Sequence, residues 1–199
     1  METIFDQLNK KIFLFINHFA GNSIVLDKIA TITATYLPLI FIFILFYSWF
    51  KYKKFRHSIL YCSYSAILGL LLNYLITLFY FHPRPFMDKI GIILIHHVPE
   101  TSFPSDHTTF MTSIACMLLY FKKTRNIGIL LLLLAVIGGT ARVFAGIHYP
   151  FDIMGSFLVA GIASFIVFYM KSKLVRINEL ILNTYIKIEN AIFFKNNRT

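Results

Sequence analysis

The sequence predicts an all-α protein: a polytopic membrane helix bundle with about five transmembrane helices and an interfacial amphipathic helix at each end. Composition is the first observation behind this prediction. The 199-residue chain is 57% hydrophobic and only 14% charged, whereas soluble domains are about 45–50% apolar and about 25% charged. The second observation is that long uncharged runs separate a few short charged segments. The length fits a single domain, residues 1–199.

Five uncharged runs approach the ~20 residues that a helix needs to cross the hydrocarbon core. Each must be helical in lipid, because its backbone N–H and C=O groups have no water to pair with. A buried soluble helix could account for one such run, but not for five. The third and fourth runs are slightly short, so we expect them to borrow residues from their polar flanks. The predicted spans are Ile29–Phe50, His57–Phe81, His107–Phe121, Asn126–Ala141 and Ile153–Met170.

The formal net charge of +10 identifies the cytoplasmic side. Basic residues gather in the loop Lys51–Arg56, in the loop Lys122–Arg125 and in the tail from Lys171, whereas the opposite loops are close to neutral. Short loops rich in Lys and Arg stay in the cytoplasm. Five spans with the N-terminus outside and the C-terminus inside satisfy this rule at every loop. The basic excess is therefore a topology signal, and we expect no nucleic-acid partner.

Amphipathic segments flank the five spans. Apolar residues recur there at helical spacing with polar residues between them, which predicts helices lying in the headgroup region. A partner-binding role is the alternative for both segments. The N-terminal set is Phe5, Leu8, Ile12, Phe15 and Phe19, and the C-terminal set is Ile177, Ile181, Tyr185, Ile188 and Ile192.

Residues suited to phosphate chemistry collect on the predicted outer side. Arg84 and Arg142 lie close to the hydrocarbon, where a charge is costly unless it is paired or hydrated. A guanidinium offers a rigid fork of donors that fits phosphate oxygens. His107 and His148 can exchange protons near neutral pH. Asp152 follows His148 by four residues, so on a helix its carboxylate would orient the imidazole and stabilise its charged form.

Each of these residues also has a purely structural interpretation. Arg84 could be an interfacial side chain, and Asp152 could be a helix N-terminal acid. Ser105 precedes the third span, where it could be a simple N-cap or part of an anion site at a helix N-terminus. His107 alone could be a polar loop residue. For a second polar cluster, a solvent-facing loop is favoured over a metal site; its members are His96, His97 and Glu100.

The combination of motifs and their order indicates chemistry. Tyr80–Phe86 reads YFHPRPF, Ser102–Thr109 reads SFPSDHTT, and Arg142–Asp152 has the spacing Arg-x5-His-x3-Asp. These stretches resemble the signature of the PAP2 (type 2 phosphatidic acid phosphatase) superfamily, Lys-x6-Arg-Pro, Pro-Ser-Gly-His and Ser-Arg-x5-His-x3-Asp. The surrounding residues are similar to those of the bacitracin-resistance-type undecaprenyl-diphosphatases. The resemblance covers a motif-bearing core of about residues 77–152 and implies a PAP2-like membrane bundle.

The resemblance implies a role for each matching residue. His148 would attack the terminal phosphorus and form a phosphohistidine, with Asp152 orienting it. His107 would protonate the leaving oxygen and then activate water. The matches that would bind the substrate are Arg84, Arg142 and Ser105, with Asp106 and Thr108 beside them. No metal and no other cofactor is implied, because the arginines supply the positive charge.

The chain departs from the family pattern at three positions. Thr77 stands where the pattern has Lys, so one phosphate-binding cation would come from elsewhere, and His82 and Lys89 are the candidates. Asp106 replaces a Gly and adds a negative charge beside the anion site, which should repel phosphate unless the carboxylate points away or pairs with an arginine. Ala141 replaces the Ser before the motif's arginine.

The expected function is hydrolysis of undecaprenyl diphosphate to undecaprenyl phosphate and phosphate, which recycles a carrier lipid for cell-wall synthesis and gives bacitracin resistance. The substrate partner would be a polyprenyl diphosphate lipid. The protein would lie in the bacterial plasma membrane with its site facing the extracytoplasmic side. Two alternatives remain open: a phosphatase of phosphatidate, phosphatidylglycerophosphate or a lipid A phosphate, and a non-catalytic protein that binds a lipid phosphate. The oligomeric state also stays open.

Overall fold

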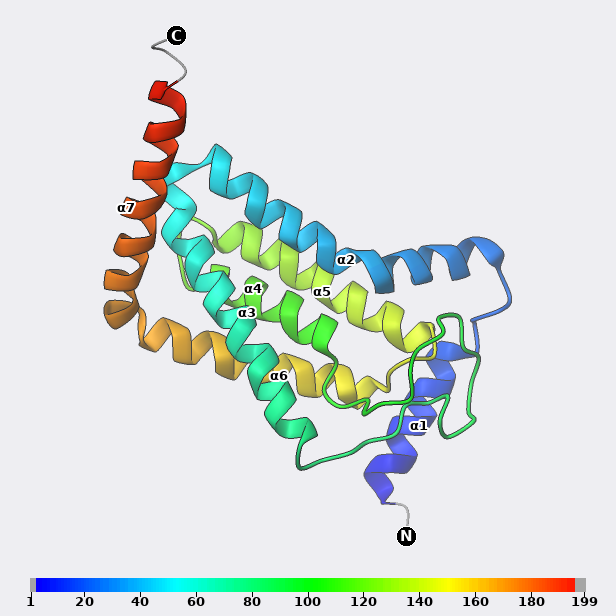
Figure 1. The fold of residues 1–199 in the computed structure, drawn as a ribbon. Coiled ribbons are helices and arrows are strands. Elements are labelled where there is room, and N and C mark those ends of the chain that lie inside the picture. The colour runs from blue at the N-terminus through cyan, green and yellow to red at the C-terminus, as the bar shows by residue number, and fades with distance from the viewer. Residues whose placement is uncertain (1–2, 196–199) are drawn as a thin grey trace.

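Helices make up the regular structure of residues 3–195, the part of the chain that this computed structural model describes. In chain order they are α1 (Ile4–Asn17), α2 (Ile24–Lys51), the short 3-10 helix η1 (Lys53–Phe55), α3 (Arg56–Thr77), α4 (Asp106–Leu119), α5 (Arg125–Phe144), α6 (Pro150–Tyr169) and α7 (Lys171–Lys195). Helices α2, α4, α5 and α6 run along a roughly common direction, α3 crosses them obliquely, and α1 and α7 stand steeply at opposite ends (Figure 1). The long connection 78–105 lies at the α1 end.

Among the described residues, four of the five predicted spans are confirmed as helices long and apolar enough to cross a membrane. They are α2, α3 together with η1, α5 and α6. The third expected span is shorter than predicted. Helix α4 has 14 residues, a length of about 21 Å at ~1.5 Å per residue, against the ~30 Å of the hydrocarbon core. It packs against α3, α5 and α6. Protein therefore surrounds it, and irregular backbone at membrane depth is tolerated where protein buries it.

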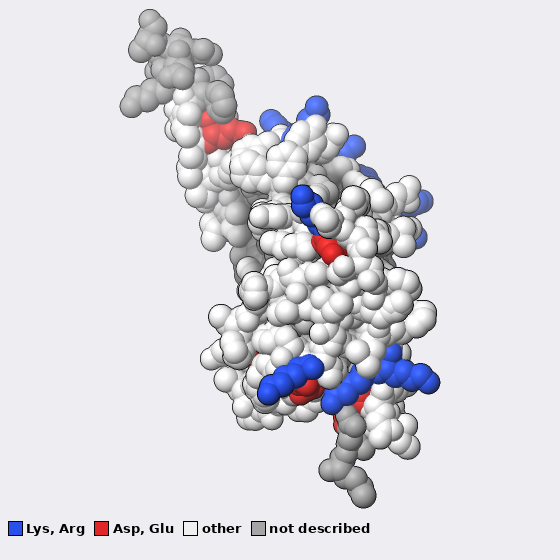
Figure 2. All heavy atoms as spheres, turned by 90° about the vertical axis from the view of Figure 1, so that its right-hand side faces the viewer, with Lys and Arg blue, Asp and Glu red and all other residues white. Residues whose placement is uncertain are grey.

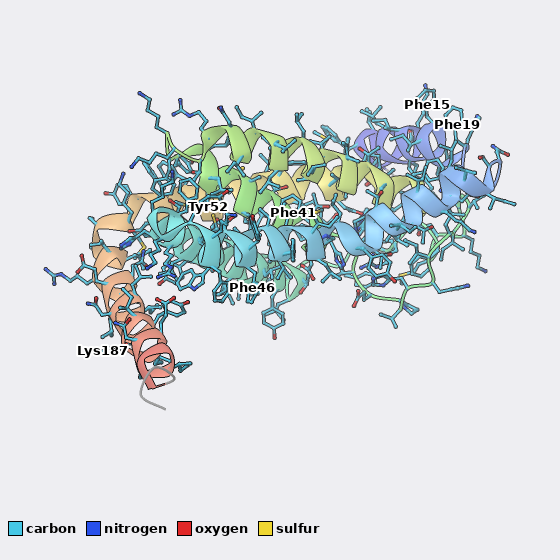
Figure 3. All side chains as sticks on the ribbon, turned by 90° about the horizontal axis from the view of Figure 1, so that it is seen from above. Phe15, Phe19, Phe41, Phe46, Tyr52 and Lys187 are labelled. Atoms are coloured by element: carbon cyan, nitrogen blue, oxygen red, sulfur yellow. The ribbon has the colours of Figure 1, made fainter. Side chains whose placement is uncertain are left out.

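The side chains of α2 show how the bundle divides its surface. Phe41 is fully buried in the cluster that α2 shares with α3, α4 and α5. Phe46, 62% exposed, points away from the other helices (Figure 3). Soluble monomers rarely expose large contiguous apolar areas, so the outer side of α2 has the character of a lipid-facing surface.

Helix α1 ties together the loops at its end of the bundle. The Asn17 side chain donates to the carbonyls of Ile92 and Phe144, each at 2.8 Å, and accepts from the Ile92 N–H at 2.6 Å. One amide thus joins the connection before α4 to the end of α5. Phe15 and Phe19 project outward from α1 (Figure 3), as expected for an amphipathic helix at an interface.

Helix α7 docks on the opposite end through an arginine. The Arg56 guanidinium lies 5.6 Å from the ring centroid of Trp49 and 4.6 Å from that of Tyr185, and its Nη2 is 3.6 Å from Glu189 Oε1. Cation–π contacts and the ion pair hold α7 across the start of α3. The predicted C-terminal helix is confirmed, and its exposed apolar residues, such as Ile188, fit a helix at the bilayer surface.

Candidate active site

Three segments meet at the α1 end of the bundle: the connection 78–105, the first turn of α4 and the turn 145–149 between α5 and α6. Gly146 makes the close approach possible, because its φ of 80° suits glycine and a Cβ there would lie 2.3 Å from the Ile92 carbonyl oxygen. The chain then enters α6 through Pro150, at a position where proline is compatible with helix. His148 and Asp152 are thereby placed on either side of a helix start.

His148 is the centre of the polar cluster and is 1% exposed. Its Nε2 lies 3.2 Å from both Arg84 Nη1 and Arg142 Nη2. Its Nδ1 lies 3.2 Å from Ser102 Oγ and 3.4 Å from Asp152 Oδ2. Burial lowers the pKa of His148 to about 3, so the ring is neutral at neutral pH. With a proton on Nδ1 toward the carboxylate, the Nε2 lone pair faces the arginines, which is the arrangement of a nucleophile.

The Asp152 carboxylate is fully buried behind His148. Its Oδ2 accepts from the Tyr149 N–H at 2.7 Å and accepts a short hydrogen bond from Ser102 Oγ. Its Oδ1 lies 3.2 Å from His82 Nδ1. Burial alone would lower the pKa of His82, but contact with this carboxylate raises it above its ordinary value. The helix start and these donors together stabilise a buried negative charge.

The two arginines are each 4% exposed and are oriented by backbone carbonyls. Arg84 Nη1 donates to Ile147 O at 2.9 Å, and Arg142 Nη1 donates to Ala34 O at 3.0 Å. Arg84 Nη2 also donates to Glu100 Oε1 at 3.0 Å. Within the described part of the chain, the Nε of each arginine is buried without a hydrogen-bond partner. An unpaired buried donor costs roughly 1–3 kcal/mol, so both guanidinium groups retain capacity for an anion.

A cavity of 360 Å³ opens beside His148. This volume falls within the ~300–1,000 Å³ typical of small-molecule sites. The side chains of α3 contribute an apolar wall, while arginines and histidines from the other segments form the polar wall. The lining residues are Leu70, Tyr74, Thr77, Arg84, His97, Glu100, Thr101, Pro104, Asp106, His107, Arg142 and His148.

Most of the predicted site residues come together here. Those lining the cavity are Arg84, Asp106, His107, Arg142 and His148. Ser105 and Thr108 are not among the lining residues. Thr108 Oγ1 donates to Ser105 Oγ at 3.1 Å, and the Ser105 N–H donates to Ser156 Oγ at 2.8 Å. The expected anion site at this helix start is therefore partly occupied by protein contacts, and the Ser105 side chain makes no capping bond.

Two departures from the family pattern line the same cavity. Asp106 Oδ1 accepts from Asn73 Nδ2 at 2.8 Å, and that amide also donates to Thr109 Oγ1 at 3.0 Å. The carboxylate thus pairs with an amide and not with an arginine. Thr77 Oγ1 donates to the Tyr74 carbonyl at 2.8 Å. A short hydroxyl stands where the family pattern has a lysine.

The two candidates for the missing cation do not line the cavity, so that expectation is wrong. His82 contacts Asp152, and Lys89 is an exposed residue with a φ of 56°. His97 does line the cavity, and its Nδ1 lies 3.5 Å from Glu100 Oε1. Glu100 and His96 are exposed, so the expected solvent-facing loop is confirmed for these two residues, whereas His97 is half-buried. Burial lowers the pKa of His97, which disfavours its charged form.

Sequence reasoning missed two groups that the structure brings to the site. Ser102 contacts both His148 and Asp152, yet a lone serine beside Phe-Pro carries no recognisable pattern. The carbonyl of Ala34 contacts Arg142 across 108 positions of sequence. A signal for it was present, because a proline stands four residues later in the first predicted span.

Fold and site together define a class: a multi-pass membrane protein whose buried histidine–carboxylate pair faces two arginines. The chain matches the PAP2 superfamily over residues 58–176, more than half of its length, and it belongs to that family. The predicted family and the predicted membrane bundle are thereby confirmed.

Named relatives and solved structures agree with this assignment. The chain is 36% identical over 186 residues to the undecaprenyl-diphosphatase BcrC of Bacillus subtilis (strain 168), covering 93% of this chain and 95% of that protein. It is 29% identical over 198 residues to the bacitracin transport permease protein BcrC of Bacillus licheniformis, covering 98% and 96%.

Two crystal structures share the fold. LpxE of Aquifex aeolicus superposes with a TM-score of 0.69 and 25% identity, covering 81% of this chain and 95% of that one. A transmembrane PAP2-type phosphatidylglycerolphosphate phosphatase of Bacillus subtilis gives a TM-score of 0.66 and 19% identity, covering 85% and 87%. The second likeness shows the fold alone.

Proposed function

We propose that this protein hydrolyses undecaprenyl diphosphate to undecaprenyl phosphate and phosphate through a phosphohistidine at His148. One observation carries the proposal: His148 Nε2 is 3.2 Å from a guanidinium nitrogen of both Arg84 and Arg142. A phosphoryl group bound by both arginines would lie directly against the nucleophile. Similarity to the Bacillus subtilis undecaprenyl-diphosphatase over 93% of the chain supports the choice of lipid.

In the first step His148 Nε2 attacks the terminal phosphorus and the bond from phosphorus to the bridging oxygen breaks. His107, on the cavity wall, donates a proton to that oxygen, so undecaprenyl phosphate leaves. Positive charge develops on the imidazole at the same time. Asp152, 3.4 Å from Nδ1, stabilises it.

In the second step the neutral His107 accepts a proton from water, and the water oxygen attacks the phosphohistidine. The N–P bond breaks, phosphate leaves and His148 returns to its neutral form. Arg84 and Arg142 would stabilise the negative charge on the phosphoryl oxygens in both steps, through donors that include their unpaired Nε groups. Preorganised charge of this kind is often the largest catalytic contribution.

The site would face the extracytoplasmic side, with the C-terminus in the cytoplasm. Basic loops favour the cytoplasm, and the basic segments next to α7 lie at the opposite end of the bundle from the α1 end (Figure 1). At the α1 end, basic and acidic side chains lie side by side at the lower edge of the face in Figure 2. Lys10 and Asp88, 3.7 Å apart, are one such pair.

Phosphate release by the purified protein in mixed micelles tests the proposal. Undecaprenyl diphosphate, phosphatidate and phosphatidylglycerophosphate are compared at equal surface concentration, with EDTA present throughout. We expect the highest kcat/KM for undecaprenyl diphosphate and full activity in EDTA. Faster release from either of the other lipids would overturn the substrate assignment, and loss of activity in EDTA would contradict the metal-free mechanism. Binding without release would identify a non-catalytic lipid-phosphate protein.

A further inference from the structure

Helix α2 carries a proline in its middle, and the helix bends there (Figure 1). Proline has no backbone N–H, so the carbonyl four residues earlier loses its intrahelical partner. For Pro38 that carbonyl belongs to Ala34, which is 2% exposed. A buried carbonyl without a donor is costly. Here Arg142 Nη1 takes the place of the missing N–H, at 3.0 Å.

The close approach of α2 and α5 at this level depends on a second residue. Gly138 precedes Arg142 by one helical turn on α5. A Cβ at Gly138 would lie 2.9 Å from Leu37 Cδ2 and 2.7 Å from Met111 Cε. The glycine therefore lets α5 lie against α2 next to Pro38, within reach of the freed carbonyl.

The freed carbonyl suits the task of orienting a phosphate-binding arginine. The guanidinium is a rigid planar fork, so fixing Nη1 also fixes the direction of Nη2, which lies 3.2 Å from His148 Nε2. A carbonyl is neutral and orients the group without cancelling its charge. A carboxylate partner, such as Glu100 beside Arg84, would instead compete with phosphate.

We propose that Pro38 is a positioning residue for the reaction: by leaving the Ala34 carbonyl without an N–H partner, it fixes the Arg142 guanidinium toward His148 and the bound phosphoryl group. The inference rests on the proposed function of this site. It assigns a catalytic consequence to a residue of the first span, which lies outside the motif-bearing core.

Pro38→Ala restores the N–H and supplies Ala34 with the intrahelical donor that Arg142 replaces. We expect kcat/KM to fall about tenfold, the factor that ~1.4 kcal/mol produces, with the loss in kcat and with weaker inhibition by orthovanadate. The melting temperature in detergent should stay the same or rise, because proline disfavours a helix interior. A purely structural role would lower stability and activity together. Leu39→Ala, at a neighbouring residue that is 56% exposed, is the matched control and should keep wild-type kinetics.

Two further measurements separate the missing N–H from the bend. Lactic acid in place of Pro38 forms an ester without an N–H, so the Ala34 carbonyl stays free and activity should remain near wild type. In an Arg142→Lys background, Pro38→Ala should change kcat/KM by less than twofold, since the two residues act through one contact. Wild-type kcat/KM in Pro38→Ala, equal losses in the alanine and ester variants, or the full tenfold loss in the lysine background would each overturn the proposal.

Failure of the proposed function is recognisable separately. It would appear as a wild-type protein that releases no phosphate from any of the lipids. Orthovanadate binding, measured by calorimetry, would then decide the role of Pro38: a weaker affinity in Pro38→Ala supports it, and an unchanged affinity overturns it.

Discussion

The two halves of the candidate site differ in one contact of their arginines: in residues 3–195, only Arg84 has a carboxylate partner. In the half carried by α5 and α6, the Ala34 carbonyl orients Arg142, and the Tyr149 N–H contacts Asp152. In the half carried by the connection 78–105, Arg84 also donates to a backbone carbonyl, that of Ile147, but its Nη2 pairs with Glu100, a side chain that is 51% exposed. An exposed ion pair contributes little free energy, so the Glu100 contact is the one that a bound anion can most readily replace. We call the part carried by α5 and α6, which holds the proposed nucleophile His148, the rigid half. The part carried by the connection 78–105, which holds Arg84 and Glu100, is the adjustable half.

Removing the proposed nucleophile tests the rigid half and should have the largest effect. His148→Ala is expected to lower kcat/KM by more than ~10³-fold, because no other group can form the covalent intermediate. Phosphate release from undecaprenyl diphosphate measures it. His96→Ala is the control, since His96 is an exposed residue of the connection and does not line the cavity. Substantial activity in His148→Ala would refute the phosphohistidine.

Ser102 links the two halves, because it comes from the connection and contacts His148 and Asp152 of the rigid half. Ser102→Ala removes a hydrogen bond to a charged group, worth ~1.5–3 kcal/mol, so kcat should fall roughly ten- to hundredfold. KM should change little, since Ser102 is not among the residues lining the cavity. Steady-state kinetics of Ser63→Ala provide the comparison, because the Ser63 hydroxyl donates to the Ile59 carbonyl of its own helix. A change confined to KM would contradict this role.

Substitution of Glu100 tests the adjustable half and should have a smaller effect on the kinetics. Glu100→Gln removes the charge that would compete with phosphate for Arg84. Exposed ion pairs are worth ~0.2–1 kcal/mol, so KM should fall by up to about fivefold with kcat nearly unchanged. The control is Glu179→Gln, an exposed carboxylate on α7. A higher KM in Glu100→Gln would show that the carboxylate assists substrate binding.

The smallest expected effect is a pH-dependent change in stability at His82. Contact with Asp152 raises the pKa of His82 in the folded protein. The contribution of this contact to the free energy of unfolding is therefore fully present below the pKa that His82 has in the unfolded chain. It is lost as the pH rises through the pKa that His82 has in the folded protein. The Tm difference between wild type and His82→Gln should therefore be larger at about pH 5.5 than at about pH 8.5, on either side of the unperturbed pKa of about 6.5. Thermal unfolding in detergent measures it, and a difference independent of pH would argue against a charged His82.

The fourth helix marks one limit of prediction from sequence. An uncharged run predicts a helix, and α4 is helical, but hydropathy cannot tell lipid from a protein interior. Helix α4 lies among α3, α5 and α6 and needs only 14 residues. The second polar cluster of the sequence, His96, His97 and Glu100, marks another limit. Two of its three residues, His97 and Glu100, line the cavity because the connection folds back over the site, and no local pattern records where a long loop folds.

By itself, the sequence determined the membrane bundle, the terminal amphipathic helices, the family and the group of histidines and arginines. These follow from hydropathy, from the distribution of charge and from spacings such as that between His148 and Asp152, all of which are properties of neighbouring residues. Tertiary structure alone decided the contacts that orient the catalytic candidates. Ser102 reaches His148 across 46 positions and Ala34 reaches Arg142 across 108. Such contacts depend on how the helices pack, because a hydrogen bond requires an approach of about 3 Å that spacing along the chain does not specify.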